Sequence, residues 1–343
     1  MRKILFLLLL NMPFLVNAQM VNQYCIMDIE SKRVIASSNM NERALTASIC
    51  KVMTLIVAIE NGNLDSYIKV TEEDNNQIGS KVYIDTDDKL QLYDALYGLN
   101  LRSGNDLAHA ISINVSGSVS DFVYLMNETA KRVGMKNTTF ENPSGLDEES
   151  KNYSTPYDLC LLVSDCYQNS VFREVFEAKA YSFKTLNQKA FLWQTKHRLV
   201  RDEGFLGGKT GYTKQAGRTL ITTKDQDGKI FVCVTMNFGD DFNFHKNALN
   251  DSLNKYERTL VMTKQVLRQT QIDIDYLPSL KEDIYLPLKK GEKIKTVVYL
   301  KGHPDDNCGY VAFFIGDEEI YRKEIYVADD EQIATYIISN LYG

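Results

Sequence analysis

The sequence has few cysteines and histidines, and it has no motif typical of a metal site. Its 343 residues include six cysteines and four histidines, with no CxxC and no HExxH pattern. Six cysteines are too few to form a disulfide scaffold for a chain of this length, and histidines this far apart do not suggest a cluster of metal ligands. We therefore expect no metal and no cofactor, and we assign no disulfide pairing.

Positive charge is also scarce. The chain has 39 Lys and Arg residues against 45 Asp and Glu residues, which gives a formal net charge of −6. Proteins that bind nucleic acid or an anionic membrane surface usually present a clear excess of positive charge. The composition therefore excludes nucleic acid as an expected partner.

The N-terminal apolar run, residues 4–10, is far shorter than the roughly 20 residues that a membrane-spanning helix needs. It follows two basic residues, is interrupted by Asn11 and Pro13, and precedes small residues that end at Ala18. This order is typical of a secretory signal peptide. We expect cleavage after residues 1–18 and an exported protein that acts outside the cytoplasm, in the periplasm or at the cell wall.

The rest of the composition is typical of a folded protein, with 44% hydrophobic and 24% charged residues. Spacing of apolar residues predicts strands near both ends of the first 260 residues and mainly helices between them. Strands are predicted over 23–29, 34–36, 217–223 and 229–237, and helices over 47–59, 92–99, 106–113, 119–133, from 156 onward and over 243–260. This order indicates an α+β domain whose sheet joins distant parts of the sequence.

The pattern changes after about Met262, where short alternating segments such as 294–300 and 310–315 are separated by Pro and Gly. We therefore expect one domain over residues 19–262 and a small all-β domain over 263–343. Residues 331–342 are too short to span a bilayer and too weakly amphipathic to predict an interfacial helix. The sequence leaves membrane association open, without a clear signal for it.

Three short motifs carry groups capable of chemistry. In Ser48-Ile49-Cys50-Lys51, the hydroxyl and the amine lie three residues apart at the start of a predicted helix, so both project from one face. A lysine accepts the serine proton only if burial or a neighbouring cation lowers its pKa. The SxxK pattern alone is weak, because it recurs at Ser66 and Ser252 in segments that we interpret as exposed.

The second motif is Ser103-Gly104-Asn105, which lies between two predicted helices and could present a hydroxyl and an amide to a cleft. Alone it is equally consistent with a helix cap. The third, Gly207-Gly208-Lys209-Thr210-Gly211, precedes the predicted hairpin and suits an edge strand that a ligand approaches closely. It is not a phosphate loop, because Glu203 occupies the position of the required first glycine.

Together, and in this order, the three motifs match the set found in penicillin-binding proteins and class A β-lactamases. The chain resembles the low-molecular-mass penicillin-binding proteins, which are serine D-alanyl-D-alanine carboxypeptidases of peptidase family S11. The resemblance extends over four segments: Thr46–Thr54, Leu99–Ala108, Met126–Leu146 and Gly208–Gly217. It implies the penicillin-binding and β-lactamase-like transpeptidase fold, an antiparallel sheet with a helical region, followed by a small β domain.

The resemblance also implies roles for individual residues. Ser48 would attack the D-Ala-D-Ala peptide bond, Lys51 would accept its proton, and Ser103 would pass a proton to the leaving amine. Lys209 would keep Lys51 neutral and attract the terminal carboxylate of the substrate. The expected partners are peptidoglycan stem peptides, with β-lactam antibiotics as covalent inhibitors.

Further residues would bind the substrate. The resemblance implies that Asn105 binds its peptide group, that Thr210 and Gly211 contribute from the third motif, and that the backbone N–H groups of Ser48 and Tyr212 form an oxyanion hole. The family also uses a basic residue beyond the hairpin to bind the carboxylate. In this sequence His245 or Lys246 lies in that region, and the sequence does not choose between them.

Two alternatives stay open. A serine β-lactamase could share the fold, but class A enzymes have Asp at the position of Gly104 and a deacylating glutamate that has no clear counterpart here. A wall-binding protein that has lost turnover would also keep the pocket. Cys50, at a position where the family more often has threonine, and Gly207 before Gly208 depart from the family pattern.

Overall fold

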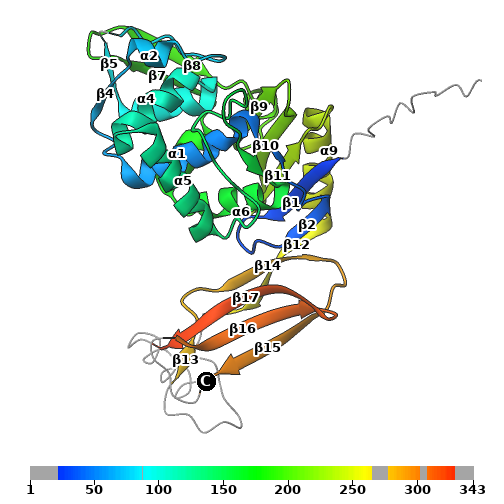
Figure 1. Ribbon diagram of the computed structural model, residues 1–343. Coiled ribbons are helices and arrows are strands. Elements are labelled where there is room, and N and C mark those ends of the chain that lie inside the picture. Colours follow the sequence, from blue (N-terminus) through cyan, green and yellow to red (C-terminus); the bar gives the residue numbers. More distant parts are fainter. Residues whose placement is uncertain (1–21, 87, 265–276, 302–306, 329–343) are drawn as a thin grey trace, which may run out of the picture.

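The computed structural model describes residues 22–86, 88–264, 277–301 and 307–328. They form a larger part, made of a sheet with helices around it, and a smaller sheet that lies beside it (Figure 1). The predicted signal peptide and residues 331–342 lie outside the described residues. None of the helices in these ranges is long and apolar enough to cross a membrane.

The larger part is organised by an antiparallel sheet of five strands in the order β2-β1-β11-β10-β9. Its strands are β1 (Gln23–Asp28), β2 (Val34–Ser38), β9 (Gly208–Thr213), β10 (Gly217–Gln226) and β11 (Lys229–Met236). β1 pairs with both β2 and β11, so the start of the described chain joins the hairpin of β10 and β11 in one sheet. β9 is the edge strand, as the sequence predicts for the Lys-Thr-Gly segment.

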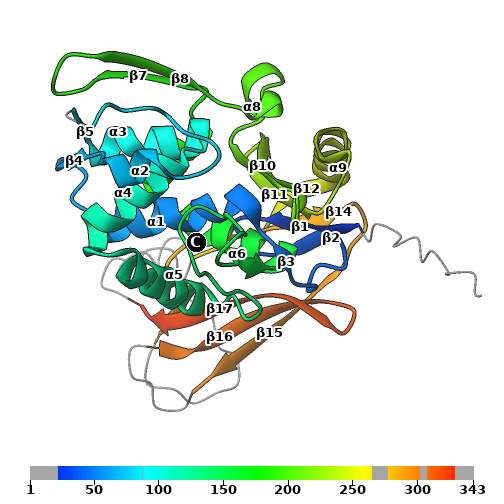
Figure 2. The same ribbon diagram turned by 45° about the horizontal axis from the view of Figure 1, so that its top comes forward.

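Helices cover both faces of this sheet. Helix α9 (Asp241–Lys255) packs on one face, where Leu249 and Leu253 join a core with Phe231 of β11. Helix α6 (Pro156–Cys166) packs on the other face against β1 and β11 (Figure 2). Thr155 caps α6 and Pro156 occupies its first turn, as the sequence predicts.

The helical region surrounds α1 (Lys51–Asn61), whose first eight residues are all buried. A helix that is apolar on every side must lie inside a domain, and α1 contacts α4, α5, α6 and α7. The first turn of the predicted helix 47–59 is a 3-10 turn, η1 (Ala47–Cys50), instead of α-helix. Ala47 has φ of +46°, a conformation that non-glycine residues rarely adopt, so the backbone is strained next to Ser48.

The remaining elements of the larger part complete this helical region. They are α2 (Glu72–Asn75), α3 (Leu92–Tyr97), the π-helical turn η2 (Gly98–Arg102), α4 (Asn105–Ser116), α5 (Val119–Val133), α7 (Ser170–Glu177) and α8 (Arg198–Asp202), with the strand pairs β3 (Ala44–Leu45) and β6 (Tyr153–Ser154), β4 (Tyr67–Lys69) and β5 (Lys89–Gln91), and β7 (Ala180–Lys184) and β8 (Ala190–Gln194). The sequence does not predict the β7–β8 hairpin, which is fixed to α3 by stacking of Tyr181 on Tyr97 at 3.6 Å between ring centres.

The predicted helix over 243–260 is wrong at its C-terminal end. Helix α9 ends at Lys255, and the next residues form β12 (Tyr256–Met262), which pairs with β14 (Ile284–Lys289). Thr259, Leu260 and Val261 suit a strand, and pairing with a partner far along the sequence decides the outcome. The domain boundary at residue 262 stays a prediction. β12, which ends at that residue, pairs with β14 and so connects the two parts.

The smaller part has the all-β character that the sequence predicts. Its sheet has the order β13-β17-β16-β15, formed by β13 (Pro278–Ser279), β15 (Ile294–Leu300), β16 (Asn307–Ile315) and β17 (Glu318–Val327). Its core includes Leu286, Val311, Phe313 and Ile325. The two parts are joined by ion pairs between Arg33 and Glu292 at 3.0 Å and between Arg258 and Glu30 at 3.1 Å.

Candidate active site

The three motifs meet at the edge of the central sheet. Ser48 lies on η1, and Lys51 begins α1; Ser103 and Asn105 lie where η2 ends and α4 begins; Lys209 lies on β9. Ser48, Ser103, Thr210, Gly211 and Tyr212 line one hollow of about 360 Å³, which we call the active-site hollow. The fold therefore brings together residues as far apart in the sequence as Ser48 and Tyr212.

Lys51 is at the centre of the polar contacts. Its Nζ donates to Ser48 Oγ at 3.1 Å, to Asn105 Oδ1 at 2.7 Å and to the backbone oxygen of Ser144 at 2.5 Å. Only 2% of the residue is exposed. The predicted Ser-Lys contact is thus present, and the same amine fixes the side chain of Asn105.

The pKa of Lys51 is lowered to about 8, mainly by burial and in smaller part by the nearby Lys196 cation. Burial also lowers the pKa of Lys209, and there the Lys51 cation contributes. Burial is therefore the largest cause of the lowered pKa at both lysines. A neutral Lys51 can accept a proton from Ser48, and protonating both amines at once is unfavourable.

This pKa predicts a pH dependence. Lys51 must be neutral to act as a base, so the rate of acylation by penicillin should rise about tenfold per pH unit below pH 8 and level off above it. Stopped-flow measurement of acylation from pH 6 to 9 tests this. A rate that is flat over that range would contradict a base role for Lys51.

Ser103 contacts the second lysine. Lys209 Nζ donates to Ser103 Oγ at 2.9 Å and to the backbone oxygen of Thr210 at 2.8 Å, and only 2% of Lys209 is exposed. Ser103 has φ of +60°, a left-handed conformation that costs energy for a non-glycine residue. The ammonium of Lys209 and the end of η2 thus hold the Ser103 hydroxyl beside the hollow.

β9 and η1 approach each other closely at Gly211. A Cβ atom added there would lie 2.9 Å from the backbone nitrogen of Ser48 and 2.3 Å from Thr219 Oγ1. Only glycine permits this contact. Tyr212 is 67% exposed, and the role that the resemblance implies for it requires only its backbone N–H group.

Gly145 also lies close to the backbone of η1. It has φ of +84°, and an added Cβ would lie 1.9 Å from the backbone oxygen of Ala47. Gly117 has nearly the same φ, +83°, but nothing lies within 4 Å of an added Cβ. Comparing substitutions at the two glycines therefore separates the effect of backbone strain from the effect of a steric clash.

We expect Gly117→Ala to destabilise the protein by about 1 kcal/mol, the cost of a left-handed non-glycine residue. Gly145→Ala should lose more stability and also slow acylation strongly, because Ala47 and Ser48 must move. Thermal unfolding and penicillin labelling of both variants test this. Equal effects of the two substitutions would show that the contact with Ala47 does not matter.

The structure does not support either residue expected beyond the hairpin. His245 is fully buried and bonds to Thr235 and Thr222, and Lys246 pairs with Glu203 at 2.6 Å; neither lines the active-site hollow. Both side chains are held by partners that do not line the hollow.

Two other basic residues line the hollow, and sequence reasoning missed both. Arg218 lies opposite Tyr212 on β10 and pairs with Asp241 at 2.6 Å. Lys196 donates to Ser80 Oγ at 3.1 Å. The predicted strand 217–223 could have indicated Arg218, because residues opposite each other on paired strands share a face; no sequence signal pointed to Lys196.

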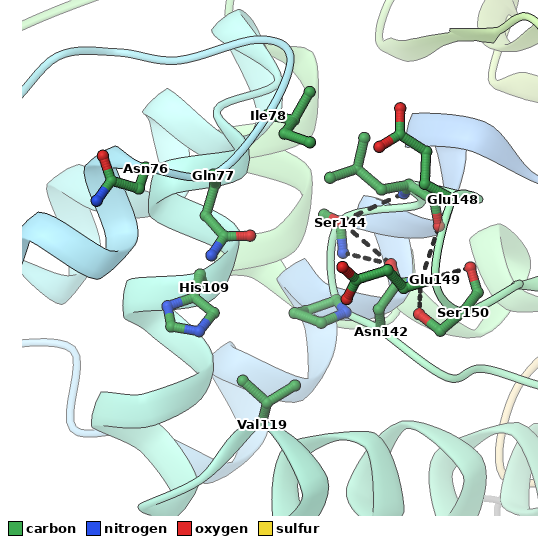
Figure 3. Close-up of a pocket in the computed structure, with 12 residues that line it drawn as sticks. Asn76, Gln77, Ile78, His109, Val119, Asn142, Ser144, Glu148, Glu149 and Ser150 are labelled. Carbon is green, nitrogen blue, oxygen red and sulfur yellow. Dashed lines mark hydrogen bonds between the residues drawn. The ribbon is translucent and has the colours of Figure 1, made fainter.

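A separate cavity of about 310 Å³ has Ile78 among its lining residues. Gln77 and His109 face it from one side, and the loop with Ser144 and Glu149 faces it from the other (Figure 3). None of the motif residues lines it. Among the described residues, no group of three His, Cys, Asp or Glu side chains could hold a metal ion, and all six cysteines are unpaired and buried.

Comparison with solved structures defines the class of protein. Penicillin-binding protein 5 from Haemophilus influenzae superposes with a TM-score of 0.76 over 91% of this chain and 98% of that chain, at 23% identity. The DD-transpeptidase of Streptomyces K15 superposes with a TM-score of 0.63 at 26% identity, over 68% of this chain and 96% of that chain. The fold is therefore that of the penicillin-binding proteins, as expected.

Sequence comparison gives the family. The D-alanyl-D-alanine carboxypeptidase family, Peptidase S11, matches residues 16–239, and the chain belongs to it. The D-alanyl-D-alanine carboxypeptidase DacF of Bacillus subtilis is 25% identical over 315 residues, 80% of each chain. A D-alanyl-D-alanine endopeptidase of Haemophilus influenzae is 31% identical over 64% of this chain and 74% of that protein.

Proposed function

We propose that this protein is a serine-type D-alanyl-D-alanine carboxypeptidase that forms an acyl-enzyme on Ser48. Membership of the family establishes the reaction class, a hydrolase acting on D-alanyl-D-alanine peptides. The observation that carries the serine mechanism is the 3.1 Å contact between Ser48 Oγ and the buried Lys51 Nζ.

Acylation begins when neutral Lys51 accepts the proton of Ser48 and Ser48 Oγ attacks the carbonyl carbon. The tetrahedral oxygen lies toward the backbone N–H groups of Ser48 and Tyr212, a kind of interaction worth about 3 to 4 kcal/mol per donor. The C–N bond then breaks, and the leaving amine takes a proton from Ser103. Lys209 can return a proton to Ser103 through their 2.9 Å contact. Water hydrolyses the acyl-enzyme.

The substrate's terminal carboxylate would bind at the end of the hollow lined by Thr210 and Arg218, beside Lys209, whose Nζ contacts Ser103 and Thr210. Arg218 takes the role first sought at His245 or Lys246. Its bidentate pair with Asp241 fixes the guanidinium in place, through contacts at 2.6 and 3.1 Å. A fixed guanidinium is well suited to a carboxylate.

One observation favours the carboxypeptidase over a class A β-lactamase. Within the described ranges, the acceptors of Lys51 are a hydroxyl, an amide oxygen and a backbone oxygen, and no carboxylate contacts its Nζ. Class A enzymes use a glutamate to activate the deacylating water. We therefore expect slow loss of a penicillin adduct.

We further propose that the enzyme acts on peptidoglycan stem peptides outside the cytoplasm, after removal of the predicted signal peptide. The test is release of D-alanine from a pentapeptide ending in D-Ala-D-Ala, with fluorescent penicillin as a second probe. D-alanine release and a stable label support the proposal. Rapid destruction of penicillin would favour the β-lactamase, and labelling without release would favour a wall-binding protein.

A further inference from the structure

Two histidines that the proposed mechanism does not use lie inside the larger part. His197 is 1% exposed and His245 is 0% exposed. His197 directly precedes α8, which contacts α9, and His245 lies on α9, which packs on β10 and β11 (Figure 2). A buried polar ring needs hydrogen-bond partners, because leaving it without them is costly. The partners of these two rings lead to the edge strand β9.

A single threonine hydroxyl joins the two rings. Thr222 Oγ1 on β10 lies 2.9 Å from His197 Nε2 and 2.7 Å from His245 Nδ1. The chain of contacts continues on both sides. His245 Nε2 lies 2.9 Å from Thr235 Oγ1 on β11, and His197 Nε2 also lies 3.1 Å from the backbone oxygen of Ile221. We call His197, Thr222, His245 and Thr235 the histidine chain.

The contacts of the histidine chain fix where its protons lie. The backbone N–H of Val200 donates to His197 Nδ1 at 3.4 Å, so the proton of the neutral ring is on Nε2 and is donated to Thr222 Oγ1 and the Ile221 oxygen. The Thr222 hydroxyl can then donate to His245 Nδ1. Burial lowers the pKa of His197 to about 3 and also lowers the pKa of His245, so both rings are neutral at neutral pH.

His197 packs against the backbone of β9 behind Lys209. Gly208 lies opposite Thr222 in the register of β9 and β10. An added Cβ at Gly208 would lie 2.6 Å from His197 Nε2, so the ring contacts this strand directly. Successive residues of a strand point to opposite faces. The side chain of Lys209 therefore lies on the other face of β9, where its Nζ contacts Ser103.

The same ring also lies behind the second cation proposed to bind the substrate carboxylate. The rings of His197 and Phe242 are nearly perpendicular, with 5.2 Å between their centres, and Phe242 lines the active-site hollow. The guanidinium of Arg218 lies over the Phe242 ring, 5.5 Å from its centre. His197 thus supports Lys209 through Gly208 and Arg218 through Phe242.

We propose that His197 is a positioning residue for recognition of the substrate carboxylate, held in place by the histidine chain. The inference rests on the proposed function, because the carboxylate is that of a D-alanyl-D-alanine peptide. His197 does not line the active-site hollow and acts through Gly208 and Phe242. Loss of its hydrogen bonds should therefore weaken recognition of the carboxylate more than the chemistry at Ser48.

The test compares two substitutions of equal length, His197→Met and His197→Gln. The glutamine amide can donate to the Ile221 oxygen, whereas methionine fills the space without a donor. The substrates are a pentapeptide that ends in D-Ala-D-Ala and the same peptide with an amidated C-terminus. Both yield the same shortened peptide, which liquid chromatography measures. Titration with labelled penicillin counts the active sites, so that misfolded protein does not enter the rate.

We expect His197→Met to lower kcat/KM for the free carboxylate about five- to tenfold, the effect of one or two neutral hydrogen bonds. Its kcat/KM for the amidated peptide should stay within about twofold of wild type, and His197→Gln should stay within about twofold on both peptides. A merely structural role would reduce the number of labelled sites or slow both peptides alike. It would not change the ratio between the two substrates.

A second pair of variants keeps the test decisive if His197→Met yields no labelled enzyme. Thr222→Val keeps the shape of the side chain but removes the hydroxyl that both rings share, and Thr222→Ser keeps that hydroxyl. Thr222→Val should lower the preference for the free carboxylate about five- to tenfold, and Thr222→Ser should keep the wild-type preference.

Three results would overturn the inference. His197→Met could keep the wild-type ratio between the two peptides, the methionine and glutamine variants could lose that ratio equally, or a labelled Thr222→Val variant could keep it. A wild type that cleaves both peptides equally would instead overturn the proposed carboxylate site. A wild type that releases no D-alanine would overturn the proposed function itself, so these failures are distinguishable.

Discussion

Ser48→Ala should abolish covalent labelling by penicillin and reduce D-alanine release to background. The hydroxyl is the nucleophile of the proposed mechanism, and its oxygen is the one that contacts Lys51 Nζ, at 3.1 Å. No acyl-enzyme can form without it. Removing a triad-type nucleophile leaves only the catalysis supplied by binding and the oxyanion hole. Gel fluorescence with a labelled penicillin measures the result.

The fold should tolerate this substitution. Alanine is smaller than serine by one oxygen, and the change removes one hydrogen bond, which costs about 1 kcal/mol. Ser252→Ala, in the SxxK pattern on α9, is a matched control and should label like wild type. Ser252 is buried, so the expectation that this pattern is exposed was wrong. Full labelling of Ser48→Ala would remove Ser48 from the mechanism, and an unfolded variant would be recognised by circular dichroism.

Lys51→Met should lower the rate of penicillin acylation by about 10²- to 10⁴-fold, the usual contribution of a general base. Methionine has a similar length and fills the buried site, so α1 should keep its packing. The substitution leaves Asn105 Oδ1 and the Ser144 backbone oxygen without their donor, which costs roughly 1 to 3 kcal/mol for each group.

A second readout separates the chemical role of Lys51 from this loss of stability. The residual acylation of Lys51→Met should no longer rise between pH 6 and 8, because the group that titrates near pH 8 is gone. Lys51→Arg should not restore the rate, since a guanidinium stays protonated. A slow variant that keeps the wild-type pH profile would show that another group is the base.

Much of the fold could be predicted from the sequence because its elements have clear periodicity and end signals. The predicted helix over 119–133 matches α5 at both ends, where Ser118 caps the helix and Gly134 ends it. The strand at 256–262 could not be predicted, because it depends on pairing with β14, more than 20 residues further along the chain. Non-local pairing overrides local preference there.

The candidate site also has features that the sequence predicts and features that depend on the packing of distant segments. The three motifs predicted which residues would meet, since their chemistry is specific in combination. The contacts of Lys51 with Asn105 and Ser144 depend on how separate segments pack, which no motif contains. Lys196 was missed for that reason, because it reaches the hollow through the fold of its loop and not through a motif. Arg218 lies outside the motifs as well, although the predicted strand places it opposite Tyr212.

The most direct test of the account is to locate the penicillin adduct in the chain. Trypsin cleaves after Arg43 and Lys51, so residues 44–51 form one peptide that contains Ser48. After labelling and digestion, mass spectrometry should find the penicilloyl mass on this peptide, with fragment ions that assign it to Ser48. An adduct on any other residue, or a fully active enzyme that carries no adduct, would contradict the central claim.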